Sequence, residues 1–211
     1  SNYMHDDNAL FSEFGMELWR KMSQDLNYNV MFSPRGIINL AHSDAQMNVY
    51  ARRGNSMRLN GIDAVLLNRE EVKEIIPMAD FSENVRFPIF GGLMQPSAGT
   101  ARHDAVAWGY ARQADAMGVD IIQNCEVTGF DVVAGKINGV RTSRGDIKVK
   151  KIGLCVAGST NILADKLNIN LPVETHLLQA CVSEPVKPVL DRVVTFGAGH
   201  FYISQSDKGE M

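Results

Sequence analysis

The fold is most constrained by a feature near the middle of the chain. It is a loop followed by a run of residues whose apolar members recur with the periodicity of a helix. Residues 91–98 are rich in glycine, proline and serine, which is typical of a loop. Small and apolar residues then recur three or four positions apart. The members of this stripe are Ala101, Ala105, Trp108, Ala111, Ala114 and Met117. This spacing predicts an amphipathic helix over about 101–117 that buries the stripe, and Gly118 is placed to end it.

His103 falls in the first turn of this predicted helix. The unpaired N–H groups and the dipole of a helix start make protonation of an imidazole less favourable there. A neutral imidazole is a nucleophile. From the pattern alone, His103 is either a solvated surface histidine or a nucleophile, and both interpretations stay open.

The overall composition excludes several classes of function. The 211 residues carry a formal charge of −3 with acidic and basic side chains interspersed, so we expect no nucleic acid partner and no membrane surface. No apolar run is long enough to span a bilayer. The three cysteines, Cys125, Cys155 and Cys181, are far apart and odd in number, which predicts reduced, buried thiols in a cytoplasmic protein. The five histidines have no ligand spacing, so no metal site is expected.

Hydrophobic periodicity and turn residues predict a mixed α/β and α+β chain. Helices are expected at 9–26, 43–59, 69–76 and 161–167. Strands are expected at 30–32, 36–41, 64–67, 85–93, 119–122, 126–133, 136–142, 147–150, 151–158, 171–186, 193–196 and 200–204. Asp207-Lys208-Gly209 predicts a hairpin turn, after which only Glu210-Met211 remain for the returning strand. We therefore expect an internal piece of a longer polypeptide, with an unpaired edge near Ser204 and an end that frays or pairs between copies.

The apolar run 151–158 leads through Ala157-Gly158 into a helix. Such a turn can present backbone N–H groups to a phosphate, although parallel-sheet proteins also use it merely to reverse direction. The sequence contains no G-x-G-x-x-G, P-loop or G-x-S-x-G motif. No catalytic residue is assigned from motifs.

Several stretches of the chain resemble the β subunits of heterotetrameric sarcosine oxidases, which belong to the amine-oxidising FAD flavoproteins. The matching stretches are residues 23–33, 101–112, 118–129, 182–188 and 202–209. The resemblance implies oxidative demethylation of sarcosine to glycine, with electrons passing from FAD to a covalent FMN and then to oxygen. It also implies α, γ and δ subunits as partners.

The resemblance further implies particular site residues. His103 matches the histidine that carries FMN through its 8α-methyl carbon, and Val127, Ala157 and Gly158 match positions that contact FAD. The ligand of the substrate carboxylate stays open among several arginines, namely Arg35, Arg58, Arg102 and Arg112.

The resemblance also implies two partial domains. Residues 1–28 and 98–170 would form the remnant of a doubly wound FAD-binding domain that lacks its N-terminal glycine-rich unit. Residues 29–97 and 171–211 would form part of a substrate domain with an antiparallel sheet. Because half of the dinucleotide site is missing, we expect the isolated chain to be inactive and to hold neither FAD nor FMN.

Two alternatives remain. One is a segment of a single-flavin oxidase of glycine or dimethylglycine, in which His103 would stay unmodified. The other is a non-catalytic module that contacts other subunits.

Overall fold

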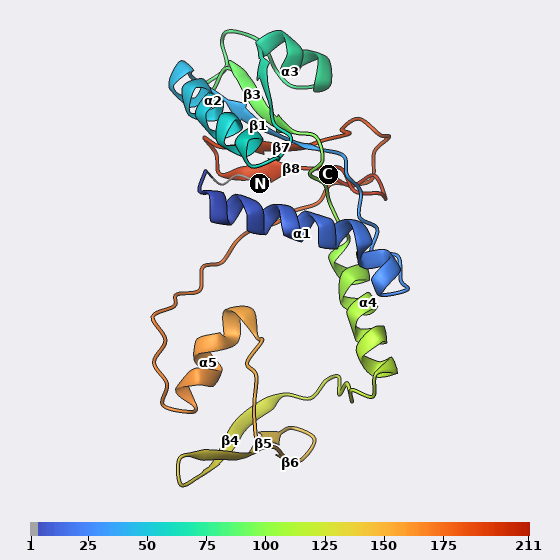
Figure 1. The fold of residues 1–211 in the computed structure, drawn as a ribbon, viewed down its shortest axis with the longest axis vertical. Helices are drawn as coiled ribbons and strands as arrows, with labels where there is room; N and C mark the ends of the chain where they lie inside the picture. The colour runs from blue at the N-terminus through green and yellow to red at the C-terminus, as the bar shows by residue number, and fades with distance from the viewer. Residues whose placement is uncertain (1–3) are drawn as a thin grey trace. The chain divides into compact units, whose positions relative to one another are not determined.

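The computed structural model describes residues 4–211, which form two compact units (Figure 1). The first comprises the chain up to Gly118 together with Val182–Met211, and the second comprises Val119–Cys181. Each unit has its own sheet, and the mixed α/β and α+β class is confirmed. The two expected domains are defined by their functions, whereas these two units are defined by their internal contacts. The division into an FAD-binding and a substrate domain therefore stays a prediction.

The first unit contains a five-stranded sheet built from segments that are distant in sequence. In spatial order its strands are β2 (Val65–Asn68), β3 (Gly91–Gln95), β1 (Ile37–Ala41), β7 (Val193–Phe196) and β8 (Phe201–Ile203). β1 and β7 are parallel, and the other neighbouring pairs are antiparallel. Asn39 in β1 lies opposite Leu93 on one side and Thr195 on the other. The central strand is therefore held by the middle and the C-terminal parts of the chain.

Two helices pack on this sheet, and a side chain caps the start of each. α2 (Asp44–Leu59) follows Ser43, whose hydroxyl accepts a backbone hydrogen bond at 3.2 Å. α3 (Arg69–Ile75) follows Asn68, which forms a reciprocal capping box with Glu71. These bonds satisfy N–H groups that a helix start leaves unpaired. Both predicted helix starts are confirmed.

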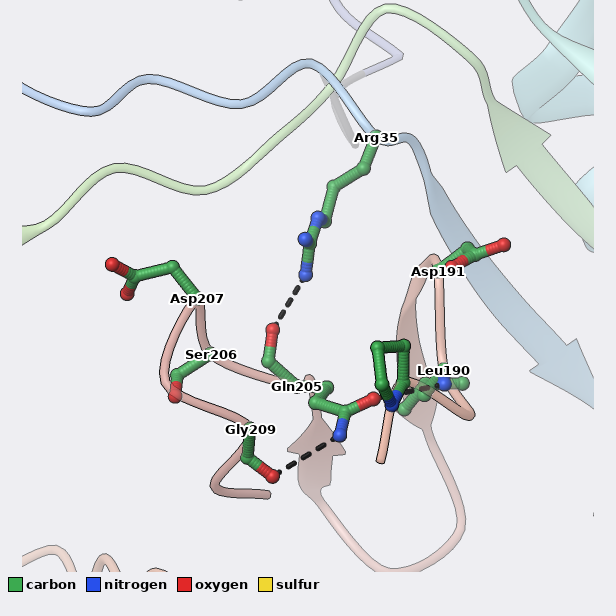
Figure 2. Close-up of a pocket in the computed structure, with 8 residues that line it drawn as sticks. Arg35, Leu190, Asp191, Gln205, Ser206, Asp207 and Gly209 are labelled. Carbon is green, nitrogen blue, oxygen red and sulfur yellow. Dashed lines mark hydrogen bonds between the residues drawn. The ribbon is translucent and has the colours of Figure 1, made fainter. Parts of the chain in front are cut away.

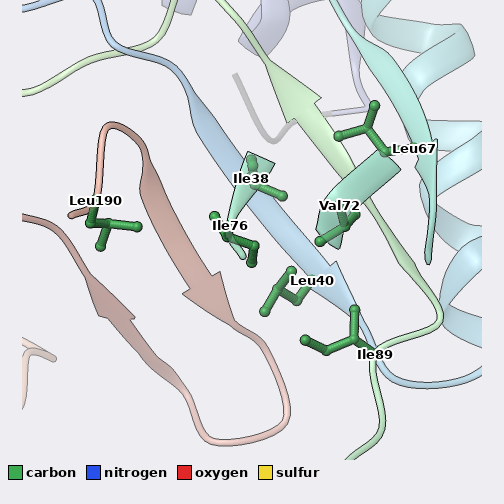
Figure 3. Packing of buried hydrophobic residues seen from close by; sticks show 7 residues of the cluster. All are labelled: Ile38, Leu40, Leu67, Val72, Ile76, Ile89 and Leu190. Carbon is green, nitrogen blue, oxygen red and sulfur yellow. The ribbon is translucent and has the colours of Figure 1, made fainter. Parts of the chain in front are cut away.

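The apolar core lies on both faces of the sheet. Side chains alternate along a strand, so Ile38 and Leu40 point to one face of β1 and Asn39 points to the other. The cluster on the α3 face consists of Ile38, Leu40, Leu67, Val72, Ile76, Ile89 and Leu190 (Figure 3). The cluster on the α2 face consists of Ala9, Met57, Ile62, Ala64 and Leu93. Because both faces of the sheet are buried, the ends of its strands are fixed in position. The loops that line the candidate functional site extend from these ends.

α1 (Asp6–Asp25) forms where the periodicity predicts it. Its apolar residues recur at helical spacing, which predicts a buried stripe, and this burial is wrong for the first three members of the stripe, Leu10, Phe14 and Leu18. Ala9 is its one buried residue. Leu10, Phe14 and Leu18 are each at least 46% exposed. Within the described part of the first unit, no element covers them.

α4 (His103–Ala116) also forms as predicted but buries only part of the predicted stripe. Its buried residues are Ala105 and Gly109, whereas Trp108, which belongs to the predicted stripe, is 55% exposed. A Cβ atom added at Gly109 would lie 3.2 Å from the Tyr28 side chain. The small residues face inward because they let the helix approach the segment after α1 closely.

The second unit contains a three-stranded antiparallel sheet of β4 (Val127–Val133), β5 (Lys136–Thr142) and β6 (Ile147–Lys148). A short 3₁₀ helix, η1 (Ala157–Ser159), and α5 (Thr160–Asp165) follow the sheet in sequence. Gly135, in the turn between β4 and β5, has φ +74°, a conformation that glycine adopts at little cost. The predicted meander is confirmed.

Four predicted strands do not form in the structure. Residues 30–32, 119–122, 151–158 and 171–186 belong to none of the strands of the described chain. Apolar runs become strands only where a neighbour pairs with their backbone groups, and periodicity cannot supply that neighbour.

The predicted burial of the cysteines is also wrong for two of the three. Cys155 and Cys181 are exposed, and Cys125 is partly buried. All three are free thiols. Within residues 4–211, no helix has the length and apolarity needed to cross a bilayer, and no His, Cys, Asp and Glu cluster is arranged to hold a metal.

Candidate functional site

An open hollow of about 910 Å³ lies in the first unit. Three segments that are far apart in sequence line it, namely residues 29–37, 99–104 and 193–210, with a further contribution from Val182. Its volume falls in the range of ~300–1,000 Å³ that is usual for ligand sites. This hollow is the candidate site.

Backbone hydrogen bonds hold the first two segments together. The Ser33 N–H donates to the Thr100 carbonyl at 2.8 Å, and the Thr100 N–H donates back to Ser33 at 3.0 Å. The Arg102 N–H donates to the Val30 carbonyl at 3.3 Å. These bonds fix the direction in which the chain enters α4.

His103 is the first residue of α4, is exposed, and lines the hollow. Arg102 precedes it in an extended conformation, and its side chain does not cap the helix. The loop–helix pattern therefore placed this histidine correctly in the first turn. Its ring is accessible to a ligand that enters the hollow.

An ion-pair cluster lies directly beside His103. Arg102 donates to Asp104 through Nε at 3.2 Å and through Nη2 at 2.7 Å, and its Nη1 lies 3.4 Å from the Asp207 carboxylate. The hydrogen bonds from Arg102 hold the pKa of Asp104 below its ordinary value, with a further contribution from the Ala105 N–H. Asp104 and, to a smaller extent, Asp207 raise the pKa of Arg102. Asp207 belongs to the predicted hairpin turn, so this cluster joins that turn to the start of α4.

The other residues expected at the site lie in the second unit. Val127 begins β4 opposite Thr142. Ala157 and Gly158 adjoin in η1, and the Gly158 carbonyl accepts a hydrogen bond from the Thr175 hydroxyl at 3.1 Å. Ala157 has φ +45°. The predicted turn therefore forms, although no strand leads into it.

Gln205 organises the C-terminal wall of the hollow, and sequence reasoning missed it. Its side chain is buried, and its oxygen accepts from the N–H groups of Val189 and Leu190. Its Nε2 donates to the carbonyls of Val186, Lys187 and Gly209, and Figure 2 shows the bond to Gly209. No local sequence signal marks this residue, because all but one of its partners lie 15 or more positions away.

The end of the chain is paired rather than frayed. The Val186 N–H donates to Gly209 at 3.0 Å, and the Ser183 N–H donates to Met211 at 2.8 Å. The expected frayed end is therefore wrong, because residues 183–186 supply its partners. β8 does lie at the edge of its sheet, as expected.

Comparisons with known proteins identify the family of the chain. The family model of FAD-dependent oxidoreductases (DAO) matches residues 2–211. The chain is 57% identical to the sarcosine oxidase subunit β of Rhizobium meliloti and 46% identical to that of Rhodobacter capsulatus. Both matches cover the whole of this chain and 50% and 51% of those proteins. The resemblance inferred from the sequence is confirmed, and the chain spans about half the length of these curated relatives.

A solved structure shares the fold. The L-proline dehydrogenase of P. horikoshii matches with a TM-score of 0.82 and 24% identity, over 99% of this chain and 55% of that one. The expected flavoprotein fold is therefore confirmed.

Proposed function

Because this chain belongs to the family of FAD-dependent oxidoreductases, we propose that it forms part of the β subunit of a sarcosine oxidase. The complete enzyme would oxidatively demethylate sarcosine to glycine in a complex with α, γ and δ subunits. The matches to two proteins of that name, which cover the whole of this chain and about half of each relative, support this assignment.

The position of His103 carries the proposal. An exposed imidazole at a helix start, on the wall of a hollow of about 910 Å³, is suited to hold a covalent FMN. The ring nitrogen that forms this bond must be unprotonated, because only the neutral imidazole is a nucleophile. The flavins that the site would hold supply the redox chemistry: two electrons from the N-methyl group would pass through FAD to FMN and from FMN to oxygen.

The residues of this chain would then have distinct roles. His103 anchors FMN, and the bonds between Ser33 and Thr100 fix the backbone just before it. Val127, Ala157 and Gly158 contact FAD. No residue of the chain is assigned the chemical step at the substrate, and the 211-residue chain by itself is proposed to be inactive.

Peptide mass spectrometry of the full-length subunit, expressed with its partners, tests this proposal. The peptide containing His103 should carry the mass of FMN, and His103→Ala should abolish covalent FMN while FAD stays bound. His176→Ala is the control, because this exposed histidine lies in the second unit. An unmodified His103 peptide would favour the single-flavin alternative. A complex without any flavin would favour the non-catalytic module.

A further inference from the structure

The sequence leaves four arginines as equal candidates for binding the substrate carboxylate, namely Arg35, Arg58, Arg102 and Arg112. The structure gives these four side chains different surroundings. Any anionic ligand of the hollow needs a cation whose hydrogen-bond donors are not already committed within the protein. Three of the four arginines have other partners or lie elsewhere.

Arg58 donates to the Ala64 carbonyl at 2.9 Å and to the Asn55 side chain at 2.5 Å. Arg112 lies over the Tyr28 ring, 5.5 Å from its centroid. Neither lines the hollow. Arg102 does line it, but two carboxylates already neutralise that side chain.

Arg35 is different, because it lines the hollow without a carboxylate partner. Its Nη1 donates to the Gln205 carbonyl at 2.5 Å (Figure 2). No acidic side chain in the described chain forms an ion pair with it. It is half-buried, and it also lines a smaller adjoining cavity of about 160 Å³. A half-buried guanidinium with free donors and no counter-ion favours an anion.

The backbone around Arg35 is fixed on both sides. Its carbonyl accepts a hydrogen bond from Arg192 Nη1 at 2.6 Å. The next residue, Gly36, has φ +82° and donates its N–H to the Ala98 carbonyl. The guanidinium of Arg35 donates a hydrogen bond to the backbone carbonyl of Gln205. The hydrogen bonds of the Gln205 side chain hold this backbone in place. The side chain is therefore positioned before any ligand binds, which reduces the entropic cost of binding.

None of the carboxylates that the structure describes around the hollow forms an ion pair with Arg35. Asp104 and Asp207 are paired with Arg102, and Glu210 accepts a hydrogen bond from the Ser206 hydroxyl at 3.2 Å. Asp191, in the smaller cavity, is exposed, and Figure 2 shows its carboxylate directed away from Arg35. Lys208 adds a second positive charge to the wall.

We propose that Arg35 is the anion-binding side chain of this hollow and that it binds an oxyanion through its planar N–H groups. The oxyanion is either the phosphate of the flavin mononucleotide or the carboxylate of the N-methyl amino acid. Thr100, Ser204 and Tyr202 line the same hollow, and each has a hydroxyl that can donate a hydrogen bond. This assignment rests on the proposed function, which places both ligands in the complete enzyme.

The test uses the full-length subunit in complex with its partners and compares Arg35→Gln, Arg35→Lys and the control Arg112→Gln. Affinities for FMN and for riboflavin, which lacks the phosphate, are measured by fluorescence with each variant in the His103→Ala background, where no covalent bond to FMN forms. The KM for sarcosine is measured in parallel with His103 intact. If the oxyanion is the phosphate, Arg35→Gln weakens FMN binding about 10- to 100-fold and leaves riboflavin binding unchanged.

If the oxyanion is the carboxylate, Arg35→Gln raises the KM for sarcosine by a similar factor and leaves FMN affinity unchanged. Arg35→Lys keeps the charge but loses the planar fork, so it should give a smaller loss in the same measurement. If the complex that carries Arg35→Gln does not assemble, the Arg35→Lys variant still tests the proposal. Wild-type values in both measurements for both Arg35 variants would overturn the proposal.

Mass spectrometry of the wild-type His103 peptide is recorded separately. An unmodified peptide contradicts the proposed function. A modified peptide together with unaltered Arg35 variants contradicts only the anion site.

Discussion

Gly99 lies so close to Ser33 that an added Cβ atom would sit 2.1 Å from the Ser33 carbonyl oxygen. Real Cβ atoms do not approach backbone atoms this closely, so only glycine allows the two segments to pair here. The pairing directs the chain into α4 and so places His103 at the edge of the hollow.

Gly99→Ala should therefore destabilise the chain. The methyl group must push the Ser33 backbone away, and we expect a loss of about 1–3 kcal/mol in the free energy of unfolding. Urea denaturation measures it. Gly15→Ala is the control, because nothing lies within 4 Å of its added Cβ inside α1, and it should stabilise slightly. Equal stabilities of the two variants would contradict the close approach.

Gln205→Ala should loosen the C-terminal wall of the hollow. The substitution leaves five backbone groups without their side-chain partner, and we expect a loss of about 2–4 kcal/mol in the free energy of unfolding. Amide hydrogen exchange should become faster at Val189 and Leu190. Gln24→Ala, at an exposed position of α1, should change neither quantity. Unchanged exchange at Val189 and Leu190 would show that Gln205 does not hold this wall.

The contact between Arg102 and Asp104 should respond to pH in a defined direction. The pKa of Asp104 is lowered from 3.8 in the folded state, chiefly by the hydrogen bonds from Arg102. Its contribution to stability is thus fully present above pH 3.8 and is lost as the pH falls through the lowered value. A carboxyl carbon NMR titration should place its midpoint below 3.8.

Arg102→Gln should raise that midpoint toward the ordinary value. Asp80, whose pKa is lowered by hydrogen bonds from Ser82, serves as the internal control and should not respond. If Arg102→Gln left the titration midpoint of Asp104 unchanged, Arg102 would not be the cause of the lowered pKa.

The 211-residue chain alone should bind free FAD more weakly than about 1 μM. Its sequence has no glycine-rich turn leading into a helix that could hold the pyrophosphate. Fluorescence titration with FAD, with riboflavin as the comparison, should give similarly weak binding for both. Micromolar or tighter binding of FAD would mean that these residues hold the pyrophosphate in another way.

The sequence by itself determined the features that depend on neighbouring residues. Ser43 and Asn68 cap their helices through side chains three residues from the N–H groups they bond, so both starts could be predicted. The placement of His103 in the first turn of α4 followed in the same way from the spacing after it and from the loop before it, although residues 91–95 of the expected loop form β3.

Only the tertiary structure decided which faces are buried and which apolar runs become strands. Ile38 pairs with Val194 across more than 150 residues, whereas residues 151–158 find no strand partner, and no local pattern distinguishes the two. The hollow depends on the same long-range contacts, because three distant segments form its wall. Arg35 could therefore be separated from the other arginines only after folding had given those others their partners.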